Sequence, residues 1–208
     1  MLPRHGVRPD FNAGQVAILE MVDCRPTYMA FASAPEDNEF EFLIKRSQSG
    51  NTASALFDLQ TDQTVTLKDI VGRGFPLRDH KEQDLIFIAM GTGLAPLRSA
   101  LRQIFRSRQE YGRLVVLYGV RTAEDFCFTN EMATEWRDHE VDLRRVISRP
   151  ENAGWDGPTG YVQSLLDNLI PTLHKPVALV CGSKDMVAQT RERLLSMNLV
   201  PEKILTNY

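Results

Sequence analysis

The chain has 208 residues, of which 43% are hydrophobic and 25% are charged, and its formal net charge is −3. These values are typical of a globular protein with one or two cores, and they give no reason to expect binding to nucleic acid or to an anionic membrane surface. No apolar run approaches the length of a membrane span, and the opening MLPRHGVRPDF lacks the apolar core of a secretory signal.

The cysteines and histidines show no spacing that is typical of metal ligands. They are Cys24, Cys127, Cys181, His5, His80, His139 and His174. We expect solvated surface positions for the histidines, no metal or iron–sulfur cluster, and a reduced compartment. That compartment is expected to be the cytoplasm, or the interior of an organelle if an upstream targeting segment is missing.

The first part of the chain, up to about residue 75, has short strand-like runs separated by turn residues. Strands are expected over 15–21, 28–33, 39–46 and 64–70, and a short helix over 53–59. In the third run, Phe40, Phe42 and Ile44 alternate with mostly polar residues, which predicts one packed face and one wet face. This pattern predicts a small antiparallel β-barrel.

From about residue 82 onward, apolar runs alternate with helical patterns. Strands are expected over 84–90, 113–118, 142–147, 177–180 and 204–207, and helices over 96–108, 130–138, 161–169 and 184–197. Such alternation predicts a parallel sheet with crossover helices. The polar segment 78–84 separates the two parts, so we expect one domain over residues 1–78 and a second over residues 82–208.

The segment 84–96, DLIFIAMGTGLAP, is the centre of the second part. Its apolar residues do not alternate, which predicts a central strand that is buried on both faces. Gly91 and Gly93 allow a sharp turn and a close approach of a ligand to the backbone, and the N-terminus of a helix follows. The segment predicts an anion site, although a turn without a ligand stays open as the alternative.

Turn-forming residues also follow the other strands of the predicted sheet. The four strand ends carry Gly91-Thr92-Gly93, Tyr118-Gly119-Val120-Arg121, Ser148-Arg149-Pro150 and Cys181-Gly182-Ser183. In open parallel sheets, ligands bind beyond the carboxyl ends of the strands. Four ligand-compatible strand ends on one edge therefore favour a ligand site at that edge.

The order and wording of these loops resemble the ferredoxin–NADP reductase superfamily of flavoproteins, in its short FAD/NAD(P)-binding branch without iron–sulfur cysteines. GTGLAP resembles the G-T-G-[IL]-A-P nucleotide loop of that family, LYGVRTAEDF its LYG-x-R segment, and VCGSKDMV its C-G-x-x-x-M segment. GRGFPL resembles the run that closes the flavin barrel. The resemblance covers nearly the whole chain and implies a flavin-binding β-barrel followed by a Rossmann-like NAD(P)-binding α/β domain.

The resemblance also implies which residues contact the nicotinamide nucleotide. They are Gly91, Thr92, Gly93, Tyr118, Gly119, Arg121, Ser148, Arg149, Tyr161, Gly182 and Met186, with Cys181 beside the nicotinamide as a catalytic residue. The glycines would leave room for the ligand, so a side chain at Gly93 would block the pyrophosphate with little loss of fold. From the residues alone, Cys181 and Met186 could equally be ordinary core residues.

Ser148 and Arg149 match a family pair that holds the 2′-phosphate of NADP, and arginine suits phosphate because its donors form a planar fork. Thr159 stands near the position where the family has a lysine. NADP and NAD therefore both stay open as cofactors, and a plain surface charge stays open for Arg149.

The flavin-binding residues implied by the resemblance match their motif less closely. They are Tyr28, Ala32, Ser33, Lys45, Gly50, Asn51 and Thr52, with the final residue, Tyr208, stacked on the flavin ring as a catalytic residue. The family motif R-x-Y-S has lost its arginine and serine here, and its aromatic residue lies one step early, which reverses the facing of a strand residue. Ordinary barrel residues and a frayed C-terminus are the alternatives.

Family barrels begin with strands ahead of the segment that matches Ala13-Gly14-Gln15, and this sequence has few residues there. We expect either a barrel that is open on one side, with its exposed edge covered by a partner or a second copy, or a sequence that starts late.

The resemblance implies an enzyme, or an enzyme subunit, that passes a hydride between NAD(P)H and FAD, with onward electron transfer to a partner protein or small acceptor. Because the cofactors would carry this chemistry, no catalytic acid or base is needed. A hypothesis from a different class is a flavin-poor NAD(P)-binding module for redox sensing, or a structural subunit of a larger complex. The electron acceptor and the oligomeric state stay open.

Overall fold

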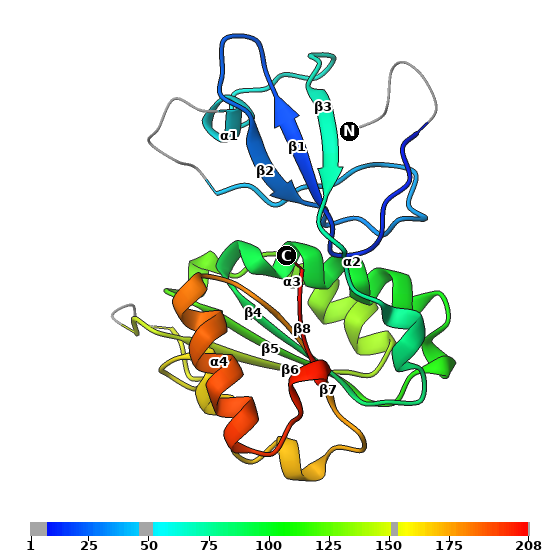
Figure 1. Cartoon of the computed structure of the whole chain (residues 1–208). Helices are drawn as coiled ribbons and strands as arrows, with labels where there is room; N and C mark the ends of the chain where they lie inside the picture. Colours follow the sequence, from blue (N-terminus) through cyan, green and yellow to red (C-terminus); the bar gives the residue numbers. More distant parts are fainter. Residues whose placement is uncertain (1–7, 46–51, 151–153, 208) are drawn as a thin grey trace.

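The computed structural model describes residues 8–45, 52–150 and 154–207. An antiparallel sheet of three strands forms the first part of the chain, and a parallel sheet of five strands forms the second (Figure 1). The predicted fold class, an antiparallel β part followed by an α/β part with a parallel sheet, is confirmed. Among the described residues, no helix has the length and apolar character needed to cross a membrane.

The first sheet has the strand order β2-β1-β3. Its strands are β1 (Val16–Glu20), β2 (Thr27–Ala30) and β3 (Thr66–Val71). One short helix, α1 (Thr52–Ala55), follows β2 and precedes β3 along the chain. One face of the sheet packs on a core of aromatic and aliphatic side chains: Phe11, Ala17, Leu19, Phe31, Phe40 and Leu56. The rings of Phe11 and Phe31 stack there at 3.9 Å between centroids.

The strand predicted over 39–46 is wrong as a strand, because only one isolated bridge, Phe31 to Phe42, forms in its described part. Its alternation is nevertheless real. Phe40, Phe42 and Ile44 pack on the core of the first sheet, whereas Leu43 packs on a core of the second. This segment lies between two cores, and that position produces a strand-like pattern without a ladder of hydrogen bonds.

The second sheet has the strand order β6-β5-β4-β7-β8, and all of its pairs are parallel. Its strands are β4 (Leu85–Met90), β5 (Leu114–Val120), β6 (Val141–Ile147), β7 (Val177–Cys181) and β8 (Ile204–Thr206). β4 is central, and its residues from Leu85 to Ala89 are buried, as the absence of alternation predicted.

Helices pack on both faces of the second sheet. They are α2 (Leu94–Phe105), α3 (Thr129–Glu131), which continues into a π-helical turn (Met132–Trp136), and α4 (Lys184–Ser196). Short 3-10 turns lie at Leu77–His80, Gly91–Gly93, Arg108–Glu110, Ala123–Asp125, Val162–Leu165, Ile170–Thr172 and Pro201–Lys203. α2 and the π turn contribute to one core, and α4 contributes to the core on the opposite face.

The helix predicted over 161–169 is wrong as an α-helix. The chain there forms the 3-10 turn Val162–Leu165 and further turns, which bury Val162, Leu166, Leu169 and Ile170 against the second sheet. The apolar spacing of this segment therefore marks a buried face, although the chain is not α-helical there. Pro171 follows and has no N–H to donate, so a regular helix does not continue through this segment.

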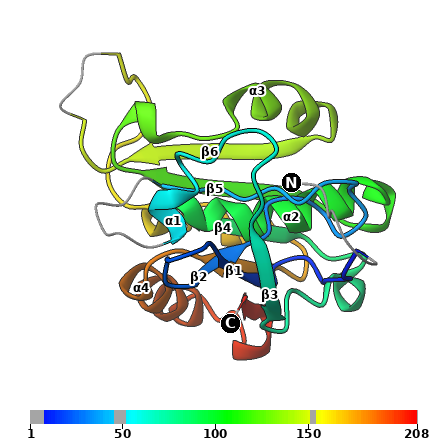
Figure 2. The ribbon, with the colours of Figure 1, turned by 90° about the horizontal axis from the view of Figure 1, so that it is seen from above.

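The two parts share a core at their junction. Ala13, Phe75 and Leu77 from the first part and the connecting segment pack with α2 and the second sheet. Gly14 has a φ of +92°, and a Cβ there would lie 2.5 Å from the Phe75 ring, so only glycine allows this packing. Figures 1 and 2 show α2 beneath the antiparallel sheet, between the two parts. The division at residues 78 and 82 stays a prediction.

Candidate functional site

The carboxyl ends of β4, β5, β6 and β7 meet at one edge of the parallel sheet. In the register of the sheet, Met90 is level with Gly119, Ala89 with Cys181, and Val120 with Ile147. The four loops that the sequence singled out therefore begin at the same edge. We call this edge, with residues 91–93, 119–121, 148–149 and 181–183, the loop edge.

The turn Gly91–Gly93 lies at the end of the central strand and leads into α2. Gly91 has a φ of +55°, and a Cβ there would meet no atom within 4 Å, so its backbone faces open space. Thr92 is exposed beside it. Gly91 and Thr92 thus have the access that a ligand at the loop edge requires.

Gly93 has a different role from the one the sequence suggested. A Cβ on this residue would lie 2.4 Å from the carbonyl oxygen of Cys181 and 2.9 Å from the backbone nitrogen of Gly182. The missing side chain therefore allows the start of α2 to pack against the end of β7. The expectation that a side chain at Gly93 would cost little fold stability is wrong.

The predicted open spaces at Gly119 and Gly182 are also filled by protein. A Cβ on Gly119 would lie 3.0 Å from the Cβ of Val162, and one on Gly182 would lie 2.2 Å from the terminal methyl of Met186. Met186 is buried in the core beneath α4 and accepts a hydrogen bond from Thr190 at its sulfur, at 3.2 Å. Gly119 and Met186 therefore have packing roles. Gly182 is partly exposed and its nearest contact is the end of the flexible Met186 side chain, so its contact with a nucleotide stays a prediction.

Tyr118 was a predicted nucleotide contact, but its side chain is fully buried. Its ring packs edge-on against Phe126 at 5.3 Å, on the face of the sheet that α2 covers. Burial raises the pKa of the hydroxyl, so this group stays protonated. Tyr118 therefore supports the strand from within, and its contact with a nucleotide stays a prediction.

Cys181 is the last residue of β7 and is partly exposed. Burial raises the pKa of its thiol to about 12, so the sulfur is neutral near neutral pH. A neutral thiol at the end of a strand can contact a flat ring but is a poor nucleophile. Its place agrees with contact to a nicotinamide rather than with covalent chemistry.

Two arginines stand beside each other where β5 and β6 end. The backbone N–H of Ser148 donates to Val120 at 3.0 Å, and that of Arg149 donates to the carbonyl of Arg121 at 2.8 Å. Both arginine side chains are exposed, and neither forms an ion pair with any residue that the structure describes. Tyr161, which is 70% exposed, follows Gly160, whose N–H donates to Ile147 at 2.8 Å. Ser148, Arg149, Arg121 and Tyr161 therefore lie together at one end of the loop edge.

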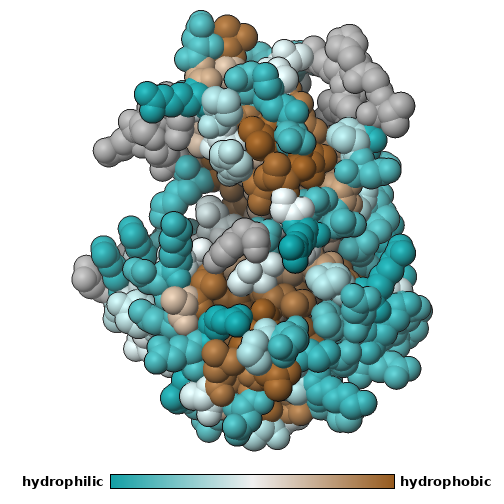
Figure 3. All heavy atoms as spheres, in the orientation of Figure 1, coloured by the Kyte–Doolittle hydropathy of each residue, from teal (hydrophilic) through white to brown (hydrophobic). Residues whose placement is uncertain are grey.

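The first sheet has an open face opposite its core. The register places Val16 beside Ala30 and Val71, and Ile18 beside Tyr28, so these five side chains share that face. Tyr28 is 68% exposed and the others are partly exposed. In the view of Figure 3, apolar side chains gather over the antiparallel sheet. We call these five residues the open face.

Three further predicted flavin residues, Ala32, Ser33 and Thr52, are buried. Ala32 and Ser33 are fully buried, and the hydroxyl of Ser33 accepts a hydrogen bond from Glu41 N–H at 3.1 Å. Thr52 is buried and donates its hydroxyl to the carbonyl of Arg25 at 2.7 Å. The side chains of Ala32, Ser33 and Thr52 are therefore not accessible to a ligand in this arrangement, and their part in flavin binding stays a prediction. Gly50, Asn51 and Tyr208 lie outside the described residues.

The open face and the loop edge adjoin each other. The position of a Cβ on Gly72, just after β3, is 3.0 Å from the carbonyl oxygen of Asn207, just after β8. Lys45, another predicted flavin residue, is exposed and places its Nζ 3.8 Å from Asp125 in the loop that follows β5. The carboxyl end of the parallel sheet thus meets the end of the open face that holds Val16 and Val71.

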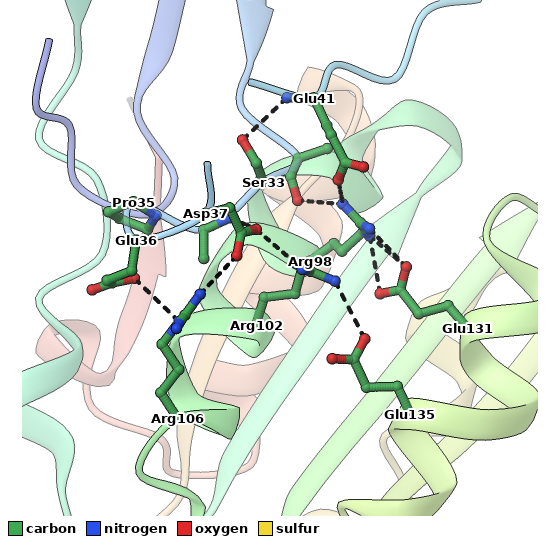
Figure 4. A network of polar contacts seen from close by, with 12 residues as sticks. Ser33, Pro35, Glu36, Asp37, Glu41, Arg98, Arg102, Arg106, Glu131 and Glu135 are labelled. Carbon is green, nitrogen blue, oxygen red and sulfur yellow. Dashed lines mark hydrogen bonds and ion pairs between the residues drawn. The ribbon is translucent and has the colours of Figure 1, made fainter. Parts of the chain in front are cut away.

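Sequence reasoning overlooked Arg98 and its partner Glu131. Arg98 is 4% exposed on α2 and connects both parts of the chain (Figure 4). The available signal was its place among Leu94, Leu97 and Leu101, at helical spacing on the buried side of α2. A charged residue in an apolar stripe is unusual enough to predict a buried ion pair.

The predicted surface positions of the histidines are partly wrong. His80 is 7% exposed in the segment that connects the two parts, and His139 stacks on Phe105 at 4.1 Å between centroids. His174 is exposed as predicted, and His5 lies outside the described residues. The three cysteines are free thiols.

Comparison with known proteins gives a family for this architecture. Residues 87–192, half of the chain, match the family described as oxidoreductase NAD-binding domain. The chain is 32% identical to fruit protein pKIWI502 of Actinidia deliciosa over 87% of its own length and 59% of that protein, so it spans about three fifths of this relative. It is 29% identical to ferredoxin–NADP reductase B of Sorangium cellulosum, over 84% of this chain and 73% of that one.

A solved structure shows the same fold over both parts. A ferredoxin–NADP+ reductase of Neisseria gonorrhoeae, with bound FAD and NADP, superimposes with a TM-score of 0.82 at 24% identity. The superposition covers 96% of this chain and 88% of that one. With its parallel sheet, its loop edge and its adjoining antiparallel sheet, the chain belongs to the oxidoreductase NAD-binding domain family, within the ferredoxin–NADP reductase and cytochrome b5 reductase group.

Proposed function

We propose that this chain binds a reduced nicotinamide nucleotide at the loop edge and passes its hydride to FAD held against the open face. The observation that carries the proposal is a contact between residues that border the two surfaces. Gly72 follows Val71 of the open face, and a Cβ on it would lie 3.0 Å from the carbonyl oxygen of Asn207, which is beside Cys181 of the loop edge. A nicotinamide ring at the end of β7 and a flavin ring on the antiparallel sheet would then face each other across this junction. Alignment of the two rings and exclusion of water are the contributions that hydride transfer asks of a protein.

The loop edge has the groups that a dinucleotide requires. The backbone at Gly91 faces open space at the start of α2, where free N–H groups favour an anion such as a pyrophosphate. Exposed Thr92 adds a hydroxyl donor, and the neutral thiol of Cys181 lies level with Ala89 on the adjacent strand. We assign the pyrophosphate to Gly91 and Thr92, and the nicotinamide to the neighbourhood of Cys181.

The open face suits an aromatic ring better than it suits the rest of a flavin nucleotide. Val16, Ile18, Ala30 and Val71 form a partly exposed apolar surface, and Tyr28 can cover a flat ring beside it. For the phosphates, Arg25, Lys45 and Arg73 are exposed cations on this part of the described chain. When bound there, FAD would accept the hydride and release electrons to an acceptor, which we propose to be a partner protein.

We propose that NADP(H) is preferred over NAD(H), because Arg121 and Arg149 stand side by side with Ser148 and Tyr161. Replacing Arg149→Ala should weaken NADPH binding by about tenfold or more, since a hydrogen bond to a charged group contributes about 1.5 to 3 kcal/mol. NADH binding should change by less than about twofold. Isothermal titration of both nucleotides measures this, with the exposed Arg137→Ala as a matched control; equal weakening of both nucleotides would contradict the preference.

A second candidate is a nucleotide-binding module without flavin. The burial of Ala32 and Ser33 and the internal hydrogen bond of Thr52 favour it, because they remove predicted flavin contacts. The absorbance spectrum of the purified protein separates the two candidates. Bound yellow flavin that bleaches when NADPH or NADH is added without oxygen supports the reductase. Colourless protein that takes up no added FAD, yet binds nucleotide, contradicts the reductase and supports the module.

A further inference from the structure

Three arginines follow one another at one-turn spacing, Arg98 and Arg102 on α2 and Arg106 directly after its last residue, and they face both parts of the molecule. Arg98, Arg102 and Arg106 contact acidic residues of segment 36–41 in the first part, and two of them also contact the helix after β5 (Figure 4). α2 thus holds the first part of the chain through charge as well as through the shared core.

Arg98 is the most buried member and has acceptors on three segments. Its Nη1 donates to the carbonyl of Ala32 at 2.7 Å and to the carboxylate of Glu41, both in the first part. Its Nε donates to Glu131 at 2.8 Å, and its Nη2 lies 2.7 Å from the same carboxylate. Contact of two guanidinium nitrogens with one carboxylate fixes the plane of the group. Arg98 is therefore held by acceptors in both parts of the chain.

Glu131 is itself held in place by a feature that the sequence does not reveal. The indole N–H of Trp136 donates to its carboxylate at 3.0 Å, and Trp136 is fully buried. The two residues are five apart, a spacing that the π-helical turn Met132–Trp136 brings onto one side. The ring of Phe128 covers the guanidinium of Arg98 at 4.3 Å. The π-helical turn therefore places Trp136 where its indole N–H holds Glu131, the carboxylate that accepts from buried Arg98.

Arg102 forms a second, more open contact of the same type. Its Nε donates to Asp37 at 2.8 Å in the first part, and its Nη1 donates to Glu135 at 3.3 Å on the helix. Burial opposes ionisation of Asp37, but hydrogen bonds from Arg102, the Ala34 N–H and Arg106 outweigh it and hold the pKa of this carboxyl below its usual value. Asp37 therefore remains charged and paired across the junction.

The elements joined by Arg98 are those that carry the two proposed cofactor surfaces. α2 begins at the turn Gly91–Gly93, α3 follows the loop that holds Arg121, and Ala32 follows β2 with Tyr28. We propose that Arg98 is a positioning residue that fixes the loop edge relative to the open face, and so aligns nicotinamide with flavin. The effect on hydride transfer rests on the proposed function, whereas the effect on the junction does not.

The test compares two variants with a matched control. Arg98→Met keeps an unbranched side chain that fills the apolar part of the site and removes the guanidinium donors, and Glu41→Gln is a milder change whose side chain is 47% exposed. Arg137→Met is the control, because its side chain is 73% exposed and its ion pair is with Asp138, outside the segment that is measured. Purified full-length proteins are compared by hydrogen–deuterium exchange without nucleotide, by NADPH titration, and by anaerobic stopped-flow reduction of the flavin.

Arg98→Met and Glu41→Gln should speed exchange in segment 32–41, and the control should not. Flavin reduction should slow by about tenfold or more in Arg98→Met, because misplacement by about 1 Å can cost as much as 100-fold. NADPH affinity should stay within about twofold, because no contact at the loop edge is removed. If Arg98→Met does not fold, Glu41→Gln carries the same prediction with a smaller effect.

Unchanged exchange in segment 32–41 in both variants would overturn the proposal, whatever the activity. Faster exchange with an unchanged rate of flavin reduction would overturn the positioning role. If the wild-type protein itself reduces no flavin, the proposed function fails, and with it the alignment of the two cofactors. The exchange data would then still decide whether Arg98 fixes the junction.

Discussion

Gly93 and Gly91 lie two residues apart, yet the structure gives them opposite roles. An alanine at Gly93 would place its Cβ 2.4 Å from the Cys181 carbonyl oxygen, where ordinary contact begins at 3.4 Å. Backbone atoms between α2 and β7 would have to move by about 1 Å, which we expect to cost about 3 kcal/mol, in the upper range for overpacked cores. An alanine at Gly91 meets no atom and costs only the strain of its positive φ, about 1 to 2 kcal/mol.

Thermal unfolding and nucleotide titration of the two variants test this difference. For a chain of this size, Gly93→Ala should lower the melting temperature by roughly 6 to 12 °C, measured without nucleotide. Gly91→Ala should lower it less, but it should weaken NADPH binding, because its methyl group enters the space in front of the turn. A Gly93→Ala protein that is as stable as the wild type would refute the packing role that we assign to Gly93.

Two further predictions concern titratable groups. Burial first, and then the charge of Lys203, lower the pKa of His80 from 6.5, so the folded protein keeps it neutral while the unfolded chain takes up a proton. The free energy of unfolding should therefore fall as the pH drops below 6.5, and less steeply in His80→Gln; urea unfolding with parallel pH profiles would contradict this. With a pKa of about 12, Cys181 has a thiolate fraction on the order of 10⁻⁴ near pH 8. Its alkylation by iodoacetamide, followed by mass spectrometry, should be slower than that of glutathione; an equal rate would show that the thiol is not held neutral.

The parallel sheet could be predicted from sequence because its signals are local. The run from Leu85 to Met90 lacks alternation for the same reason that it is buried on both faces, and a parallel sheet must place its strand ends together. The loop edge follows from those two facts. The accessible positions of Gly91 and Thr92 at this edge could therefore be predicted without knowledge of distant contacts.

The roles of single residues depended on contacts between segments far apart in the chain. The sequence does not distinguish a glycine whose missing Cβ leaves open space, as at Gly91, from one whose missing Cβ makes room for Val162, as at Gly119. The alternation of Phe40, Phe42 and Ile44 came from two cores rather than from a sheet. Such differences are set by tertiary packing, which a local pattern does not record.

The contacts of Arg98 also depend on residues that are distant in the sequence. Its neighbours on α2 predicted that its side of the helix is buried, but its acceptors come from residues 32, 41 and 131. The π turn that delivers Trp136 to Glu131 has no sequence signature in the pattern of apolar residues. The sequence shows that a charged residue, Arg98, lies among the apolar residues of α2, but it does not show which residues accept its hydrogen bonds.

The most direct test of the account is to map nucleotide binding on the backbone by NMR of the labelled protein. On addition of NADPH, we predict that the amide shifts of Gly91, Thr92, Arg121, Arg149 and Cys181 change together, at the carboxyl edge of the parallel sheet. Saturating NADPH that leaves these amides unmoved, or that shifts only residues at the opposite end of the strands, would contradict the central claim.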